Sequence, residues 1–169
     1  MKKELIEILV EKAKYNLWAN QRIVAVISAL TQEQLIQKIE SSFEGIYPTL
    51  FHIWNAENIW LERLKGISLN SWPERDLNDK NNCEKFLETS KLFLEYLEEN
   101  QSHKSFPFIE IAYSNLKGDE MRNNTYDIIF HCLNHSSYHR GQLVTILRQL
   151  GVSKIPSTDF IAYLRGSKD

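Results

Sequence analysis

Hydrophobic residues recur at intervals of three and four over most of the chain, with charged residues between them, which predicts long amphipathic helices. Two helix ends carry clear stop signals, because Gly66 and Gly151 each follow the last residue of such a pattern. Pro48 suits the first turn of the second helix. The four long helices are predicted at about residues 4–29, 48–65, 82–100 and 125–150.

Shorter elements are predicted between these helices. Thr31 and Gln34 form a capping-box pair, which indicates a short helix after the first long one. Residues 67–79 lack a helical period and predict an irregular connection. Residues 104–113 alternate hydrophobic and polar positions with a period near two, and Gly118 offers a turn, so we expect a small β-hairpin there.

Together these elements predict an all-α fold, an antiparallel four-helix bundle with a small hairpin before the last long helix. A chain of 169 residues, 43% of them hydrophobic, fits one domain spanning residues 1–169. It has only 6 glycines and 4 prolines, which also favours helices. The C-terminal tail is expected to pack on the bundle through Phe160, Ile161 and Leu164.

Charge, apolar runs and cysteine content argue against nucleic-acid-binding, membrane-bound and disulfide-rich secreted proteins. Twenty Lys and Arg against 22 Asp and Glu give a net charge of −2, so there is no electrostatic reason to expect nucleic acid or an anionic membrane as partner. Residues 1–18 lack the apolar core of a signal peptide, and no apolar run approaches the ~18 residues of a membrane span. Cys83 and Cys132 do not make a disulfide framework. We therefore expect a cytoplasmic protein.

The last long helix carries the candidate chemistry, because His131, His135 and His139 follow one another at four-residue steps. At about 100° per residue, His139 falls in the middle of the apolar stripe, His135 about 20° outside it and His131 about 60° outside it. Two imidazoles one turn apart on an inward face are a common way for a helix to bind a metal. The pair His135 and His139 is therefore favoured, and His131 is expected to border the site.

A third ligand should come from another helix. His52 is the only other histidine inside a predicted helix, because His103 follows the third helix in a polar turn. Glu57 lies within the apolar arc of the second helix, whereas His52 lies on a neighbouring face. Periodicity therefore does not decide between His52 and Glu57. Arg140 is interpreted as an exposed helix cation, with a place at the rim of the site beside Tyr138 as the alternative.

Several segments carry a resemblance to a known family: YNLWAN, LFHIWNAENIWLERLKG, and NHSSYHRGQL with the LRQLG and PSTDFIAYLR that follow it. In this order they resemble the DinB/YfiT-like family of metal-binding four-helix bundles, over nearly the whole chain. The His-x-x-x-His-Arg-Gly-Gln sequence is the most specific part. The resemblance implies a homodimer and a three-histidine metal site, with one ligand from the second helix and two from the last long helix. Those residues are His52, His135 and His139 in this chain.

The first hypothesis for function is a metal-dependent thiol S-transferase acting in stress or detoxification, since thiol-dependent transferases occur among the related proteins. Three histidine ligands leave coordination positions open, as in catalytic sites. The cofactor would be a divalent metal ion, with zinc or nickel as the leading candidates, and the partners a small-molecule thiol and an electrophilic substrate. The alternatives are a hydrolase that uses metal-bound hydroxide and a non-enzymatic metal-binding stress protein. No catalytic residue is assigned.

Overall fold

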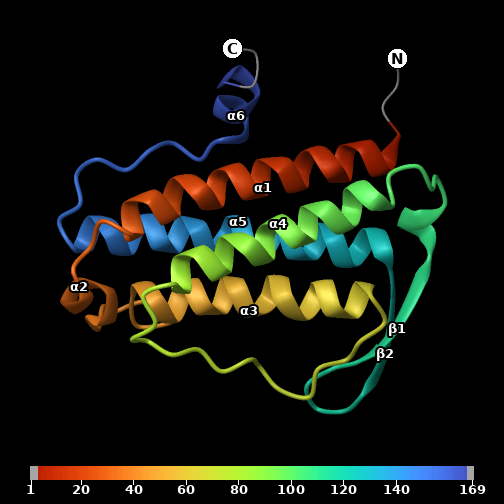
Figure 1. Cartoon of the computed structure of the whole chain (residues 1–169), viewed down its shortest axis with the longest axis horizontal. Helices are drawn as coiled ribbons and strands as arrows, with labels where there is room; N and C mark the ends of the chain where they lie inside the picture. The colour runs from red at the N-terminus through yellow and green to blue at the C-terminus, as the bar shows by residue number, and fades with distance from the viewer. Residues whose placement is uncertain (1–3, 167–169) are drawn as a thin grey trace.

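The computed structural model describes residues 4–166, and four long helices make up most of it (Figure 1). They are α1 (Leu5–Ile27), α3 (Ile46–Leu64), α4 (Asn82–Glu99) and α5 (Thr125–Gln149), whose ends all lie within two residues of the predicted ones. The shorter elements are α2 (Gln32–Ile36), the 3-10 helix η1 (Phe106–Phe108), the strands β1 (Glu110–Ser114) and β2 (Glu120–Asn124), and α6 (Phe160–Gly166).

Each long helix packs against two others: α1 against α4 and α5, and α3 against α4 and α5. In Figure 1, α1 and α5 run from right to left, whereas α3 and α4 run from left to right. Each helix therefore has one antiparallel and one parallel neighbour. The parallel pair α3 and α4 is possible because residues 65–81, an irregular connection as predicted, return along the length of the molecule. The mostly helical class is confirmed.

The predicted hairpin is present. Strands β1 and β2 pair antiparallel, with Glu110 opposite Asn124 and Ser114 opposite Glu120. The side-chain Oδ1 of Asn115 accepts the N–H groups of Lys117 and Asp119, which closes the turn. The strand pattern does not extend to residues 106–108, which form η1 instead, since a proline at position 107 has no N–H for a strand ladder.

Two apolar clusters fill the space between the long helices, and a polar layer separates them. On α3, Trp54 belongs to one cluster and Leu61 to the other; on α5, Leu143 and Leu133 are divided in the same way. The positions between these residues carry buried polar side chains, and α1 and α4 contribute to the same layer. Its main members are Asn16, Asn20, Glu57, Ser90, Ser136 and Arg140.

The C-terminal α6 packs on α1 through aromatic rings, with Phe160 5.1 Å and Tyr163 5.9 Å from the ring of Tyr15. Leu164 is half-buried, but the expected burial of Ile161 is wrong, because this side chain is 54% exposed. The face turned toward α1 carries positions 160, 163 and 164, and Ile161 lies about 100° away from it. None of the helices within residues 4–166 has the length and hydropathy needed to cross a bilayer.

Candidate metal centre

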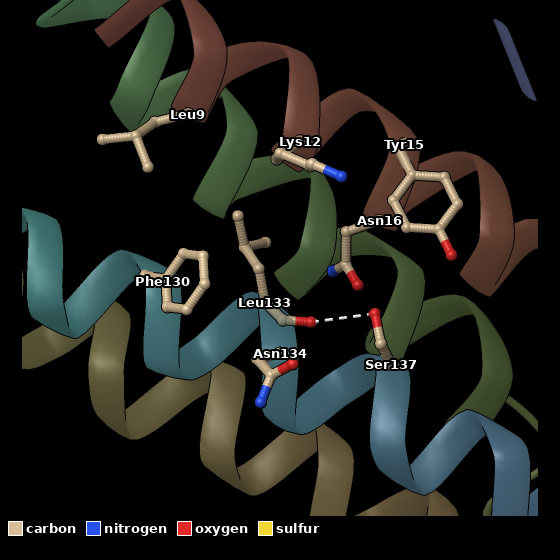
Figure 2. Close-up of a pocket in the computed structure, with 8 residues that line it drawn as sticks. All are labelled: Leu9, Lys12, Tyr15, Asn16, Phe130, Leu133, Asn134 and Ser137. Atoms are coloured by element: carbon tan, nitrogen blue, oxygen red, sulfur yellow. Dashed lines mark hydrogen bonds between the residues drawn. The ribbon is translucent and has the colours of Figure 1, made fainter. Parts of the chain in front are cut away.

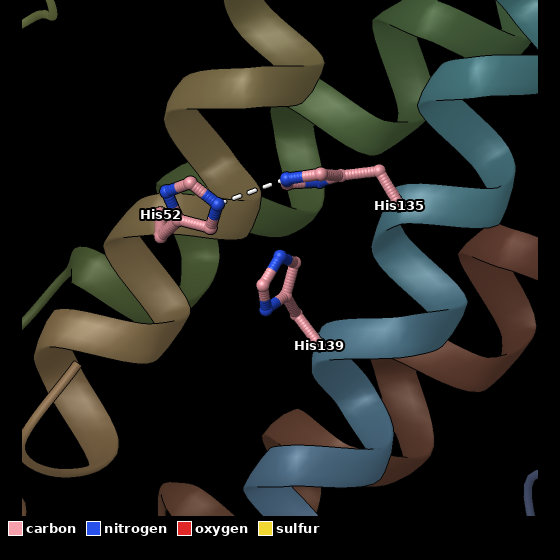
Figure 3. A group of neighbouring side chains, drawn as sticks. All are labelled: His52, His135 and His139. Carbon is pink, nitrogen blue, oxygen red and sulfur yellow. Dashed lines mark hydrogen bonds between the residues drawn. The ribbon is translucent and has the colours of Figure 1, made fainter. Parts of the chain in front are cut away.

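Three histidines from two helices converge at the level of the polar layer. His52 comes from α3, and His135 and His139 come from successive turns of α5. One ring nitrogen from each lies within 4.8 Å of the other two. Figure 3 shows the three rings turned toward a common point between the helices. The structure thus brings together the three residues that the sequence and its resemblance selected.

The hydrogen bonds of the rings leave nitrogen lone pairs for a ligand. Nδ1 of His139 donates to Oε1 of Gln142 at 2.7 Å, which leaves its Nε2 unprotonated in the neutral ring. The Nε2 atoms of His52 and His135 lie 2.9 Å apart, so one of them carries the proton of their hydrogen bond. Nδ1 of His135 is buried and has no hydrogen-bond partner among the described residues. The donor set therefore fits a metal ion that prefers imidazole nitrogen.

The electrostatics keep the rings of His52 and His135 neutral at pH 7. Burial, followed by the nearby His139, lowers the pKa of His52 to about 4. Burial, followed by the three neighbouring histidines, lowers the pKa of His135 to about 3. Only a neutral imidazole can bind a metal ion through its lone pair, so His52 and His135 are in the metal-binding form over a wide range of pH.

Burial along α5 follows the order predicted from the helical wheel. His139 is buried, His135 is half-buried, and His131 is exposed. The His131 ring lies 5.9 Å from that of His135 and 5.1 Å from that of Trp60, so it borders the cluster without joining it. His103 lies exposed in the segment after α4, as expected.

Glu57, the alternative third metal ligand from α3, is fully buried, and hydrogen bonds occupy both oxygens of its carboxylate. Its Oε1 accepts hydrogen bonds from the amides of Asn16 and Asn20 and from the hydroxyl of Ser136, and its Oε2 accepts one from Ser90. These partners come from the other three long helices, which the periodicity of α3 alone does not reveal. The structure places Glu57 outside the histidine cluster.

Arg140 is buried, so its interpretation as an exposed helix cation is wrong. Its Nη1 donates to the Oδ1 atoms of Asn16 and Asn20, and its Nη2 donates to Ser137. The same two amides thus join the guanidinium to the carboxylate of Glu57. The buried arc of α5 is about 140° wide rather than about 60°, because this helix packs against α1 as well as α3. Arg140 therefore lies away from the rim of the cluster.

A cavity of about 500 Å³ opens beside the histidines. His52 and His135 line one part of it, and His131, which also contacts Trp60, lines another. Its outer wall comes from Trp72 in the 65–81 connection and from residues 115–119 of the hairpin turn. Sequence analysis missed this wall, because a cavity formed by two loops leaves no periodic signal. Phe43, which does not line this cavity, stacks 4.0 Å from the His52 ring and lies 5.4 Å from the His139 ring.

A second cavity, of about 180 Å³, lies between α1 and α5 (Figure 2). None of the three clustered histidines reaches it; its lining consists of Leu9, Lys12, Tyr15, Asn16, Phe130, Leu133, Asn134 and Ser137. It contains no set of metal-binding side chains. The cavity beside His52 is therefore the candidate binding pocket.

Comparisons with known proteins agree with this description. The sequence model of the DinB family matches residues 1–168. Protein DinB of Bacillus subtilis (strain 168) is 29% identical over 159 residues, which cover 89% of this chain and 90% of that protein. The crystal structure of a DinB-like protein from Bacillus cereus is similar with a TM-score of 0.64 and 20% identity, covering 89% of this chain and 95% of that one. The likeness to the solved structure shows the fold.

Proposed function

The chain belongs to the DinB family, and we propose that it binds a divalent metal ion through His52, His135 and His139 and acts as a metal-dependent thiol S-transferase. The observation that carries this proposal is the convergence of three imidazoles beside a cavity of about 500 Å³. A structural metal site is normally closed by four protein ligands, whereas three ligands leave room for a substrate.

The all-imidazole donor set suits zinc and nickel, which are our leading candidates, and it also suits copper and iron. No carboxylate or thiolate takes part in the cluster. The three ligands therefore leave the full charge of the cation uncompensated, which favours an anionic substrate group. Such a cation, when bound, lowers the pKa of a thiol that reaches it and so supplies a thiolate at neutral pH.

The sulfur must come from a small molecule rather than from the chain. Cys132 is fully buried and Cys83 is largely buried, and burial raises the pKa of both thiols. In the proposed reaction the sulfur of the small thiol bonds to an electrophilic carbon while that carbon loses its leaving group, and the thiol proton passes to solvent. The rings of Phe43 and Trp72 lie 4.0 Å and 5.9 Å from that of His52 and provide apolar surface beside the site.

Turnover of monochlorobimane tests this function, since a thiol displaces its chloride to give a fluorescent thioether. Metal-loaded protein should accelerate the reaction with at least one cellular thiol, and metal-free protein and His139→Ala should not. His103→Ala, which removes an exposed histidine, is the matched control and should retain the rate. Metal binding without turnover for any thiol would leave a non-enzymatic metal protein, and product release from esters without added thiol would indicate a hydrolase.

We also interpret the four long helices as a four-helix bundle, since each contacts two of the others. The sequence predicted an antiparallel bundle, whereas the neighbours α1 and α5, and α3 and α4, run parallel (Figure 1). A role in stress or detoxification, a cytoplasmic location and a homodimeric state stay predictions.

A further inference from the structure

Arg63, near the C-terminal end of α3, is a buried cation without an anionic partner. It is only 6% exposed, and its Nε is buried with no hydrogen-bond partner. No carboxylate of residues 4–166 forms a salt bridge with it. Burying an unpaired charge is costly, so such a group in a native structure needs an explanation.

Two aromatic rings stabilise the buried Arg63 cation only in part. The guanidinium carbon lies 4.4 Å from the ring centroid of Trp60 and 4.5 Å from that of Tyr113, and the two rings meet at 78°. Rings of this kind attract the cation but do not accept the in-plane N–H bonds of a guanidinium. Arg140 offers a contrast within the same chain, because three side chains accept its N–H groups. Arg63 has no such acceptor within residues 4–166.

Arg63 lines the same cavity as the histidine cluster. Along α3 the lining positions are His52, Ala56, Ile59, Trp60 and Arg63, which follow one face of the helix. His52 and Arg63 are eleven residues apart, which corresponds to about 16 Å along the helix axis. The cavity therefore has the histidines toward one end and a buried cation toward the other.

We propose that Arg63 binds the carboxylate of an elongated thiol whose sulfur reaches the three-histidine site. A guanidinium presents a planar fork of N–H groups that matches a carboxylate, which would satisfy the donors that Trp60 and Tyr113 leave unbonded. At the rim of the cavity, Lys117 and Asp119 are both exposed and opposite in charge, so solvent screens them and they do not replace this pairing. The sulfur end of the ligand rests on the proposed function, whereas the carboxylate end does not.

The carboxylate end can be tested without metal or activity. Binding of hexanoate and of hexan-1-ol to metal-free protein is measured by NMR titration. Hexanoate should bind roughly ten- to a hundredfold more tightly than the alcohol, as expected for charge-assisted hydrogen bonds. Arg63→Met should abolish this preference. Arg75→Met is the matched control, because Arg75 also stacks on a tryptophan, at 3.5 Å from the Trp54 ring, but does not line the cavity.

The sulfur end is tested on metal-loaded protein by calorimetry, with 3-mercaptopropionate, 6-mercaptohexanoate and 8-mercaptooctanoate and the mercapto-alcohols of the same lengths. The advantage of acid over alcohol should be absent for the shortest pair, which cannot span the cavity, and appear for the longer ones. In Arg63→Met each acid should bind like its alcohol.

The outcomes separate the two proposals. Equal binding of hexanoate and hexan-1-ol to the unmodified protein overturns the Arg63 site, even where Arg63→Met does not fold. If the mercapto-alcohols bind as tightly as the mercapto-acids at every length, the proposal of an elongated thiol held by Arg63 is wrong. Metal binding by the three histidines is not affected by that result. If hexanoate binds through Arg63 but no thiol binds to the metal-loaded protein, the carboxylate site stands and the thiol, with the proposed function, is wrong.

Discussion

The Nε2 atom of His52 lies 2.9 Å from the Nε2 atom of His135, although 83 positions separate the two residues in the sequence. Two rings can approach this closely only when they share a proton rather than both carry one at the facing nitrogens. The two nitrogens are already slightly closer together than the ~3.3 Å that separates two nitrogen ligands of a tetrahedral zinc ion. The antiparallel packing of α3 and α5 therefore prepares a chelating pair before any ion arrives.

The ligand set gives the first prediction. His52→Ala, His135→Ala and His139→Ala should each lose bound metal, because two imidazoles cannot hold a divalent ion tightly against water. His131→Ala should retain metal, since its ring borders the cluster without joining it. Elemental analysis of the purified variants checks this, and His103→Ala serves as the control. Loss of metal in His131→Ala with retention in His139→Ala would contradict the assignment.

Gln142 gives the second prediction, because its Oε1 accepts the Nδ1–H of His139 at 2.7 Å and so orients the ring. Gln142→Leu should weaken metal binding by about 10- to 100-fold, the usual effect of removing a group that orients a ligand. Gln149→Leu, an exposed position on the same helix, should have no effect. Calorimetric titration with zinc measures both. Unchanged affinity in Gln142→Leu would show that the hydrogen bond does not position His139.

The sequence alone was sufficient to predict the four long helices and two of the three clustered histidines. The hydrophobic period of α5 predicted both its bounds and the order of burial of His139, His135 and His131, because these depend on the geometry of one helix. The choice between His52 and Glu57 depended on other helices. Only the fold shows that amides and hydroxyls from the other three long helices surround the Glu57 carboxylate.

Contacts with other helices and loops also explain the features that the sequence did not predict. Arg140 is buried because α1 supplies Asn16 and Asn20 as hydrogen-bond partners. The hydrophobic pattern of α5 does not predict partners that lie more than 100 positions away in the sequence. Trp72 and the hairpin turn reach the cavity through the path of two loops, which periodicity does not encode. Local geometry is therefore predictable from this sequence, and contacts between distant polar side chains are not.

The stability of the metal-free protein should depend on pH through His52 and His135, which gives the third prediction. In the unfolded chain both imidazoles titrate near pH 6.5, whereas in the folded protein their pKa values fall to about 4 and about 3. The unfolded state therefore binds more protons below pH 6.5. The free energy of unfolding should fall as the pH decreases from 7 toward 4.

Urea unfolding of metal-free protein at several pH values measures this dependence. Carboxylates also titrate in this range, so the informative quantity is the difference between each variant and the unmodified protein. His135→Gln should lose less stability between pH 7 and pH 4 than the unmodified protein, and His103→Gln should lose the same amount. Parallel curves for His135→Gln and the unmodified protein would refute the assigned cause.

The fourth prediction concerns the buried network between Glu57 and Arg140, which Asn16 and Asn20 join. Each amide donates from Nδ2 to the carboxylate and accepts at Oδ1 from the guanidinium, so removing either charge leaves the other buried without compensation. Arg140→Met should therefore lower the free energy of unfolding by about 3–5 kcal/mol. Glu57→Gln should also destabilise the protein, because it removes the buried negative charge that compensates Arg140 and replaces Oε2, the acceptor of the Ser90 hydroxyl, with an amide N–H₂ group.

The double variant distinguishes a coupled network from two independent defects. Because each single change removes the same interaction, Glu57→Gln with Arg140→Met should cost less than the sum of the two, by about 0.5–3 kcal/mol. Urea unfolding of the four proteins gives this coupling energy. All four should still bind zinc, since neither residue belongs to the histidine cluster. Additive costs would show that the asparagines do not link the charges, and loss of zinc in folded Glu57→Gln would restore Glu57 as a ligand.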